Sequence, residues 1–419
     1  MKKVKNIFLC LLITSVTAQA SVNLNKSDVD GKYKQELMNR RAGLTSKSVN
    51  KRITRANILM AKSDYKKAVD ILKGITESKK RPFEMAKAWQ TLAYAYAQNE
   101  QYPEARNAFS KVLEIDALPY GPTMQSLFAL AQLQMMDEKY DVALTTIQKY
   151  FVLAQEIKPA VYVFRASIFS EKGKKDLALK DVLKAIDMIK APEKPKENWL
   201  VFAVSLLYSK DRFKEASEYL YKLVEINIGK KAYWSQLAGS LLNMDKEEHA
   251  LAVLELALMM DLLDQEGEIK NIVSLYIQNN MPFEASELMK LAFKKGKIKK
   301  DKKSLELYAN TLVQAKEYDK AMAPLEEAAK LSSKGDLYAL QARIYLEKEN
   351  FKKAISLFDK AINKGLKKKE LGQVYLEKAI SLIQLSEFKK ANQLLDQVSE
   401  FKEHKDSALN WKNYIASLR

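Results

Sequence analysis

The chain has 419 residues, of which 47% are hydrophobic and 29% are charged, and its formal net charge is +18. This composition supplies enough apolar surface for a core and excludes a wholly disordered chain. Only 12 Gly and 9 Pro occur, which favours helices joined by short turns.

Residues 1–20 predict an export signal. Three lysines within the first five residues precede an apolar run, Ile7–Ile13, and Ala18-Gln19-Ala20 has the small-x-small pattern of a signal-peptidase site. The run is too short to span a bilayer, which takes about 20 residues. We predict cleavage after Ala20 and a periplasmic protein; the alternatives are a retained anchor or a buried N-terminal helix.

The only cysteine, Cys10, lies inside this signal. The mature chain would therefore have no thiol, which excludes disulfides, thiolate metal sites and cysteine nucleophiles. Residues 21–46 follow. They are polar and have no clean period, so they predict a loosely ordered lead-in with a helix around residues 32–41.

A repeated pattern begins after the lead-in and continues to residue 400. In Trp89–Val112, apolar residues recur at i, i+3, i+4 and i+7 in two runs separated by a polar turn, which predicts a helical hairpin. The alanine that opens the second helix recurs at Ala68, Ala105, Ala143, Ala178, Ala216, Ala250, Ala285, Ala321, Ala354 and Ala391. These ten anchor alanines predict ten hairpins, followed by a C-terminal cap helix in residues 401–419.

Two further positions recur at fixed distances from the anchor alanines. An aromatic residue stands three positions earlier in seven units, and a small residue stands twelve positions earlier in every unit. A small side chain lets two helices approach closely, and the aromatic fills the adjoining gap. The pattern resembles the tetratricopeptide repeat (TPR). The resemblance implies an all-α fold, an α-solenoid in which about ten hairpins stack into a right-handed superhelix.

In such a solenoid the first helix of each hairpin lines a concave face. Polar and aromatic residues on those helices predict a wall that suits an extended peptide, whose backbone needs donors and acceptors. The candidate partner-binding residues are Tyr94, Phe128, Gln132, Asn198, Ser205, Tyr208, Ser235, Gln236, Asn271, Ser274, Asn310 and Arg343. A cluster of Lys, Asn and Arg that would hold a C-terminal carboxylate is absent from this wall.

Two connections between hairpins are rich in lysine. One holds Lys294, Lys295, Lys297, Lys299, Lys300, Lys302 and Lys303, and another holds Lys367, Lys368 and Lys369. The first interpretation is a solvated edge. The alternative is a tether that makes weak contact with anionic lipid or lipopolysaccharide. Nucleic acid is disfavoured by export and by the lack of interleaved aromatics that could stack on bases.

Catalytic motifs are missing from the sequence. His249 and His404 are too isolated for a zinc site or a triad, and no phosphate-binding or dinucleotide-binding loop occurs. We therefore predict no enzymatic activity, no cofactor, no metal and no small-molecule substrate.

Three segments have a closer resemblance: Pro195–Leu200, Tyr233–Gly239 and Leu312–Ala321. They resemble a family of exported TPR proteins of Gram-negative bacteria that are encoded beside TonB, ExbB and ExbD. The resemblance implies a periplasmic protein-protein interaction scaffold, an accessory of TonB-dependent transport whose partners are envelope proteins such as TonB, ExbB or ExbD. It supplies no binding residues that transfer to this chain.

Overall fold

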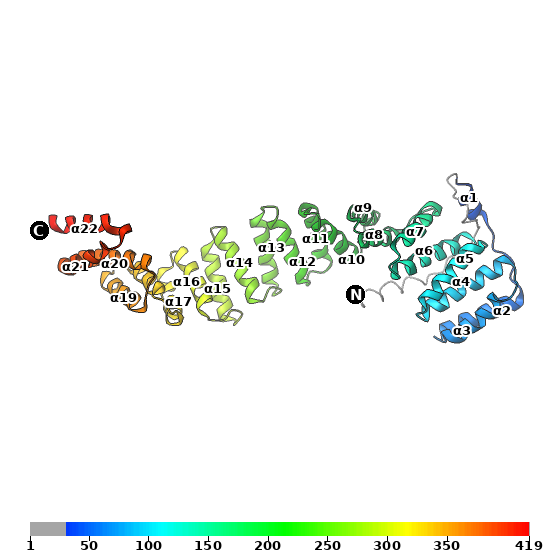
Figure 1. Ribbon diagram of the computed structural model, residues 1–419, viewed down its shortest axis with the longest axis horizontal. Helices are drawn as coiled ribbons and strands as arrows, with labels where there is room; N and C mark the ends of the chain where they lie inside the picture. The colour runs from blue at the N-terminus through cyan, green and yellow to red at the C-terminus, as the bar shows by residue number, and fades with distance from the viewer. Residues whose placement is uncertain (1–30, 419) are drawn as a thin grey trace. The chain divides into compact units, whose positions relative to one another are not determined.

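A computed structural model describes residues 31–418, and the predicted export signal lies outside the described residues (Figure 1). All regular structure in this range is helical, which confirms the all-α repeat architecture. The chain forms two compact units: unit 1 extends to Arg212 and unit 2 starts at Phe213. Each unit is described by itself.

Hairpin helices alternate along the chain, and we call the first helix of each hairpin the A helix and the second the B helix. The A helices are α2 (Lys47–Ala61), α4 (Pro82–Gln98), α6 (Tyr120–Met136), α8 (Pro159–Glu171), α10 (Glu197–Tyr208), α12 (Lys231–Leu242), α14 (Glu266–Gln278), α16 (Lys302–Gln314), α18 (Asp336–Glu347) and α20 (Lys368–Gln384). The B helices are α3 (Tyr65–Thr76), α5 (Tyr102–Ile115), α7 (Tyr140–Leu153), α9 (Lys175–Asp187), α11 (Phe213–Ile226), α13 (Glu247–Met259), α15 (Pro282–Lys294), α17 (Tyr318–Leu331), α19 (Phe351–Lys364) and α21 (Phe388–Val398). Helix α1 (Lys32–Asn39) precedes them, and a 3-10 turn (Lys402–His404) and α22 (Lys405–Ser417) follow.

The anchor alanines set the register of the B helices. Every B helix begins three residues before its anchor, and all ten anchors are fully buried. The small residues twelve positions earlier, such as Ala93 and Ala309, are buried on the facing A helices. Two backbones approach closely where these small side chains meet, so the spacing in the sequence determines how each hairpin closes.

Each turn between an A and a B helix contains one residue in the left-handed region, five positions before the anchor. Gly173 is the only glycine among them; the others include Glu138 (φ 60°) and Lys316 (φ 60°). A left-handed residue ends an α-helix and turns the chain back, which is why the same position recurs. A side chain with a Cβ is strained there.

Because the helices alternate in direction, the connections from each B helix to the next A helix lie together at one edge of a unit. We call this the inter-repeat edge. In unit 2 neighbouring connections touch: the Gly335 amide donates to the Gly365 carbonyl at 2.8 Å, and Lys297 pairs with Asp261 at 2.5 Å. The edge of unit 2 is therefore a continuous surface made of successive connections.

Residues 32–46, which we call the strap, cover the inter-repeat edge of unit 1. Lys34 Nζ donates to the Ala154 carbonyl at 2.5 Å, Arg40 Nη1 donates to the Asp116 carbonyl at 2.5 Å, and the Ser46 amide donates to Glu84 Oε1 at 2.6 Å. Ala154 and Asp116 lie in two successive connections, and Glu84 lies in the first turn of α4, just after a third. Where the sequence predicts a loosely ordered lead-in, the structure shows helix α1 and a segment held across three repeats.

The strap buries its apolar and charged anchors. Leu37 has no exposed surface, and Tyr33 is buried and forms a hydrogen bond with the carboxyl of Asp116. Arg40 lies 3.1 Å from the same carboxyl, whose side chain is only 7% exposed. Burial raises the pKa of Asp116 to about 6, although the Tyr33 hydroxyl and the Arg40 guanidinium oppose this shift.

Candidate functional site

The A helices of unit 2 present a set of polar side chains, which we call the A-helix wall: Ser235, Gln236, Asn271, Ser274, Asn310 and Arg343. Five of the six are exposed, and Arg343 is half-buried. Ser274, Asn310 and Arg343 each stand eleven residues before an anchor alanine, so they occupy the same place on α14, α16 and α18. Residues three apart on a helix share a face, which puts Asn271 beside Ser274.

Ion pairs at the ends of the A-helix wall are satisfied within the chain. Arg343 Nε donates to both carboxylate oxygens of Glu377 on α20, at 3.0 and 2.9 Å, and Gln373 also donates to Glu377. Lys270 on α14 pairs with Glu266 at 2.6 Å. The cations nearest the wall are thus already paired, so the remaining exposed groups are amides and hydroxyls. A neutral wall of this kind favours hydrogen bonds to a peptide backbone over capture of a carboxylate.

Three candidate residues of unit 1 are engaged in packing. Tyr94 packs edge-on against Phe109, and burial raises its pKa to about 12. Phe128 lies between Tyr150 and Phe164, with its ring centroid 5.1 Å from that of Phe164. Gln132 is only 8% exposed. These side chains hold α4 and α6 in place and offer little open surface, which their helical spacing alone did not reveal.

The remaining candidates of unit 1 lie on α10. Asn198 and Ser205 are exposed and Tyr208 is half-buried. Ser205 has the same offset from its anchor alanine as Ser274 and Asn310, so α10 repeats the polar position of the A-helix wall within unit 1. An exposed serine or asparagine thus occupies this position on α10, α14 and α16.

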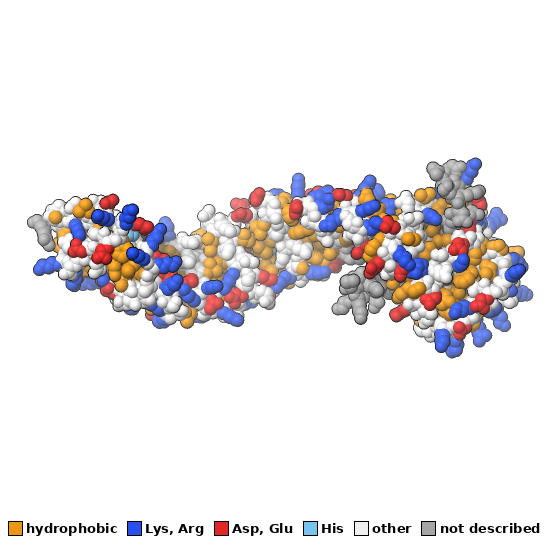
Figure 2. Space-filling view, viewed as in Figure 1, with side chains coloured by type: hydrophobic (Ala, Val, Ile, Leu, Met, Phe, Trp, Pro, Cys, Tyr) orange, Lys and Arg blue, Asp and Glu red, His pale blue; other side chains and the backbone are white. Residues whose placement is uncertain are grey.

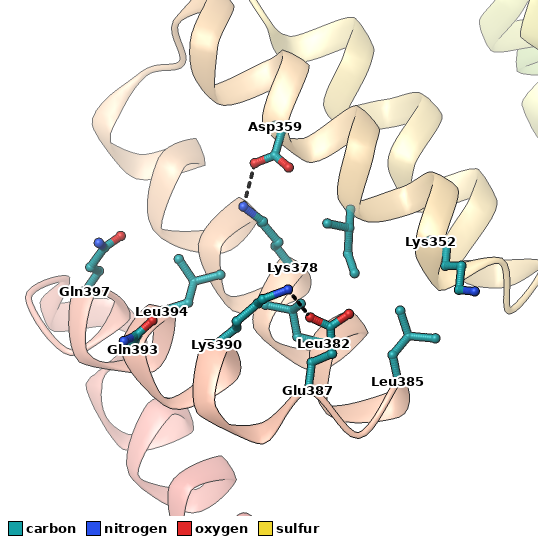
Figure 3. Close-up of a pocket in the computed structure, with 11 residues that line it drawn as sticks. Lys352, Asp359, Lys378, Leu382, Leu385, Glu387, Lys390, Gln393, Leu394 and Gln397 are labelled. Atoms are coloured by element: carbon teal, nitrogen blue, oxygen red, sulfur yellow. Dashed lines mark hydrogen bonds and ion pairs between the residues drawn. The ribbon is translucent and has the colours of Figure 1, made fainter.

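A cavity of about 430 Å³ lies between α19, α20 and α21 in unit 2 (Figure 3). Its apolar lining includes Ile355, Leu382, Leu385 and Leu394, and two ion pairs, Asp359–Lys378 and Glu387–Lys390, lie beside it at 2.5 Å each. The rim is polar and the floor apolar. Such a cavity can accept an apolar side chain from a partner.

The cavity coincides with a break in a recurring ion pair. A lysine at the end of one A helix pairs with an aspartate at the start of the preceding B helix at Lys172–Asp141 (2.5 Å), Lys210–Asp176 (2.7 Å) and Lys348–Asp319. At the cavity the corresponding residues are Leu385 and Lys352, which cannot pair.

Two kinds of site are missing from the described residues. Between residues 31 and 418, no three His, Cys, Asp or Glu side chains are grouped so that they could hold a metal ion. None of the helices described is both long and apolar enough to cross a bilayer.

Two segments of the chain match a known family of repeats. Residues 86–117 and 335–363 each match the tetratricopeptide repeat family. The chain carries tetratricopeptide repeats. The first match covers α4 and α5, and the second covers α18 and most of α19, so each falls on one hairpin with its anchor alanine. A search of curated protein sequences finds no match.

Solved structures with a similar fold are also TPR proteins. A Parabacteroides merdae TPR protein is 16% identical, with 69% of this chain and 96% of that chain covered and a TM-score of 0.35. A C-terminal part of a Cytophaga hutchinsonii TPR protein is 13% identical, with 67% and 95% covered and a TM-score of 0.41. YrrB, described as a TPR protein with an unusual peptide-binding site, is 16% identical, with 47% and 93% covered and a TM-score of 0.37.

Proposed function

We propose that this protein is a non-enzymatic scaffold that binds protein partners along the A-helix wall. The supporting observation is that exposed amide and hydroxyl side chains recur on successive A helices: Gln236 and Asn271 share one register on α12 and α14, and Ser274 and Asn310 share another on α14 and α16. An extended peptide lying across successive A helices would meet a donor or acceptor at each repeat. Arg343 and Glu377 close one end of the wall with a charged pair that can orient a partner.

The proposal extends to the cell envelope. The predicted signal places the mature protein in the periplasm, and the resemblance of three segments to TPR proteins encoded with TonB, ExbB and ExbD suggests an accessory role in TonB-dependent transport. A scaffold without a cofactor or catalytic residue suits that role, because it acts by contact with envelope proteins.

Site-specific photo-crosslinking in the native host would test the wall. A photoreactive residue at Asn271 or Asn310 should capture one or a few envelope proteins. The matched control places the same residue at Lys290 on α15 or Glu326 on α17, which are exposed on B helices. Equal capture from both sets of positions, or no capture from the wall, would reject the A-helix wall as the binding face.

Mass spectrometry of the captured protein would test the transport assignment separately. A TonB, ExbB or ExbD component supports it. A different envelope protein, captured only from wall positions, supports the scaffold and rejects the TonB link. Fractionation of the host would test localisation, since recovery of the mature chain in the cytoplasm contradicts periplasmic export.

A further inference from the structure

Six exposed lysines occupy the inter-repeat edge of unit 2, and we call them the basic edge: Lys299, Lys303, Lys334, Lys367, Lys368 and Lys369. They come from the connections α15–α16, α17–α18 and α19–α20 or from the first turns that follow. No carboxylate of the described residues forms an ion pair with any of the six. Figure 2 shows many Lys and Arg side chains on the visible face of α19 to α22.

Other lysines nearby have structural roles. Lys297 pairs with Asp261, Lys300 lies 3.7 Å from Glu327, and Lys302 lies 3.3 Å from Glu306. Lys364, in the last turn of α19, donates to the Ala329 carbonyl. These contacts give some of the lysines in and near the connections a partner within the chain. The lysines of the basic edge have no carboxylate partner among the described residues, and we call theirs the surplus charge.

The surplus charge does not help the fold. Lys303, Lys368 and Lys369 lie in the first turns of α16 and α20, and Lys367 is the N-cap of α20. Positive charge at a helix N-terminus opposes the helix dipole, and like charges in sequence repel one another. Stability therefore gives no reason for these lysines, whereas an anionic partner would be favoured by all of them.

Unit 1 shows how a polypeptide covers the corresponding edge. The strap contacts two successive connections through Lys34 and Arg40, and the first turn of α4, just after a third connection, through Ser46, one contact every six residues. The strap is basic, and its Arg40 pairs with the Asp116 carboxylate of one connection. The described residues of unit 2 include no strap, and three of its connections and the helix turns that follow them carry the lysines of the basic edge.

We propose that the basic edge binds an acidic segment of a partner protein, which crosses the three connections of unit 2 as the strap crosses those of unit 1. The segment would place carboxylates about six residues apart, one group for each connection. Leu331, 58% exposed at the end of α17, gives the middle of the segment an apolar contact. The basic edge is separate from the A-helix wall, so either proposal can fail without the other.

Two other anionic partners fit less well. The connections 295–301, 332–335 and 365–367 contain no aromatic residue, so they lack the rings that stack on exposed bases. Three large apolar side chains are more than half exposed at the inter-repeat edge of unit 2, Ile228, Met259 and Leu331, and of these Leu331 alone adjoins a connection of the basic edge. Proteins that lie on a bilayer usually insert several Trp, Phe or Leu side chains.

The test uses the full chain and a labelled peptide of about 16 residues that carries three Glu pairs six residues apart. A second peptide of the same composition has all its Glu residues in one block. We expect the spaced peptide to bind in fluorescence anisotropy at about 50 mM salt, where surface charges are weakly screened. It should bind at least about fivefold more tightly than the block peptide, because only the spaced one meets all three connections.

Variants locate the binding. Replacing the six basic-edge lysines by Gln should weaken binding of the spaced peptide about tenfold or more, since each lost charge removes a favourable contact. The matched control replaces six exposed lysines near the other edge of unit 2: Lys246, Lys316, Lys320, Lys352, Lys353 and Lys389. Its affinity should stay near that of the native protein. Thermal melting checks that both variants fold.

Four results would overturn the proposal. They are no binding of the spaced peptide, equal binding of spaced and block peptides, equal losses in the two variants, and tighter binding of an alternative polyanion through the same lysines. For the last result the probes are vesicles of phosphatidylcholine and phosphatidylglycerol and a thymidine oligonucleotide. Preference for either would identify a membrane surface or nucleic acid as the partner.

Discussion

The inter-repeat edges of the two units have the same architecture and differ in what covers them. In unit 1 the strap lies across the edge and is held by Asp116 in one connection and by Glu84 in the first turn of α4. In unit 2 three connections and the helix turns that follow them carry the basic edge, and neighbouring connections are bridged by contacts such as that from Gly335 to Gly365. The comparison shows that an edge made of connections can hold a polypeptide.

The backbone does not cause this difference. B helices in both units start three residues before a buried anchor alanine, and the turns within hairpins use the same left-handed position. Repeats of one design can therefore vary the residues of their connections without disturbing the core. This freedom is what makes the edges suitable for binding.

The largest expected effect comes from removing the apolar anchor of the strap. Leu37→Ala should cost about 2–5 kcal/mol, because Leu37 is fully buried and a cavity would remain. The strap should then detach and leave the edge of unit 1 bare, as in unit 2. Hydrogen exchange of residues 32–46 would rise sharply. Gln35→Ala, at an exposed position of α1, is the control, and unchanged exchange in Leu37→Ala would show that the strap is held by other contacts.

Next in size is a change that breaks the contacts between connections in unit 2. A Cβ added at Gly335 would lie 2.0 Å from the Ala361 carbonyl oxygen, so Gly335→Ala should destabilise unit 2 by about 1–3 kcal/mol or more. Urea unfolding measures the loss. Gly229→Ala is the control, because an added Cβ there meets no atom within 4 Å. Similar stabilities of the two variants would contradict the close approach.

A change of pH tests the buried carboxyl of Asp116, which holds the strap in unit 1. The pKa of Asp116 is about 6 in the folded chain and lower in the unfolded chain, so folding binds a proton between these values. One pKa unit corresponds to about 1.4 kcal/mol. As the pH falls from about 7 to about 4, the free energy of unfolding of the native protein should therefore rise by up to about 2 kcal/mol relative to that of Asp116→Asn. Urea unfolding at several pH values tests this. Parallel pH profiles would mean that Asp116 titrates normally.

The smallest effect concerns the turns within hairpins, where unit 1 has a glycine at one left-handed position and the described turns of unit 2 have none. Gly173 occupies the left-handed position in unit 1, and Lys316 occupies it in unit 2 with φ 60°. Lys316→Gly should stabilise unit 2 by about 0.5–1 kcal/mol, because glycine has no Cβ to strain. Lys316→Ala removes the charge and keeps the strain, so it should give no such gain. Equal melting temperatures in all three proteins would show that this turn stores no strain.

The sequence alone determined the hairpins. Small residues at two fixed offsets and an aromatic at a third predicted ten units, and the structure starts every B helix where the anchor alanines place it. This information is local: within about 15 residues, helical periodicity decides which side of each helix is buried. The exposed polar side chains of α12, α14 and α16 were predictable for the same reason.

Tertiary structure alone decided the strap, the packing of Tyr94 and Phe128, and the cavity beside Lys352. Lys34 meets Ala154 across 120 residues, and Arg40 meets Asp116 across 76. Periodicity carries no information about partners that far apart, because it describes which face of a helix is buried and does not say what covers it. Those partners become neighbours only after the repeats have stacked, when charge, shape and burial select the contacts that remain.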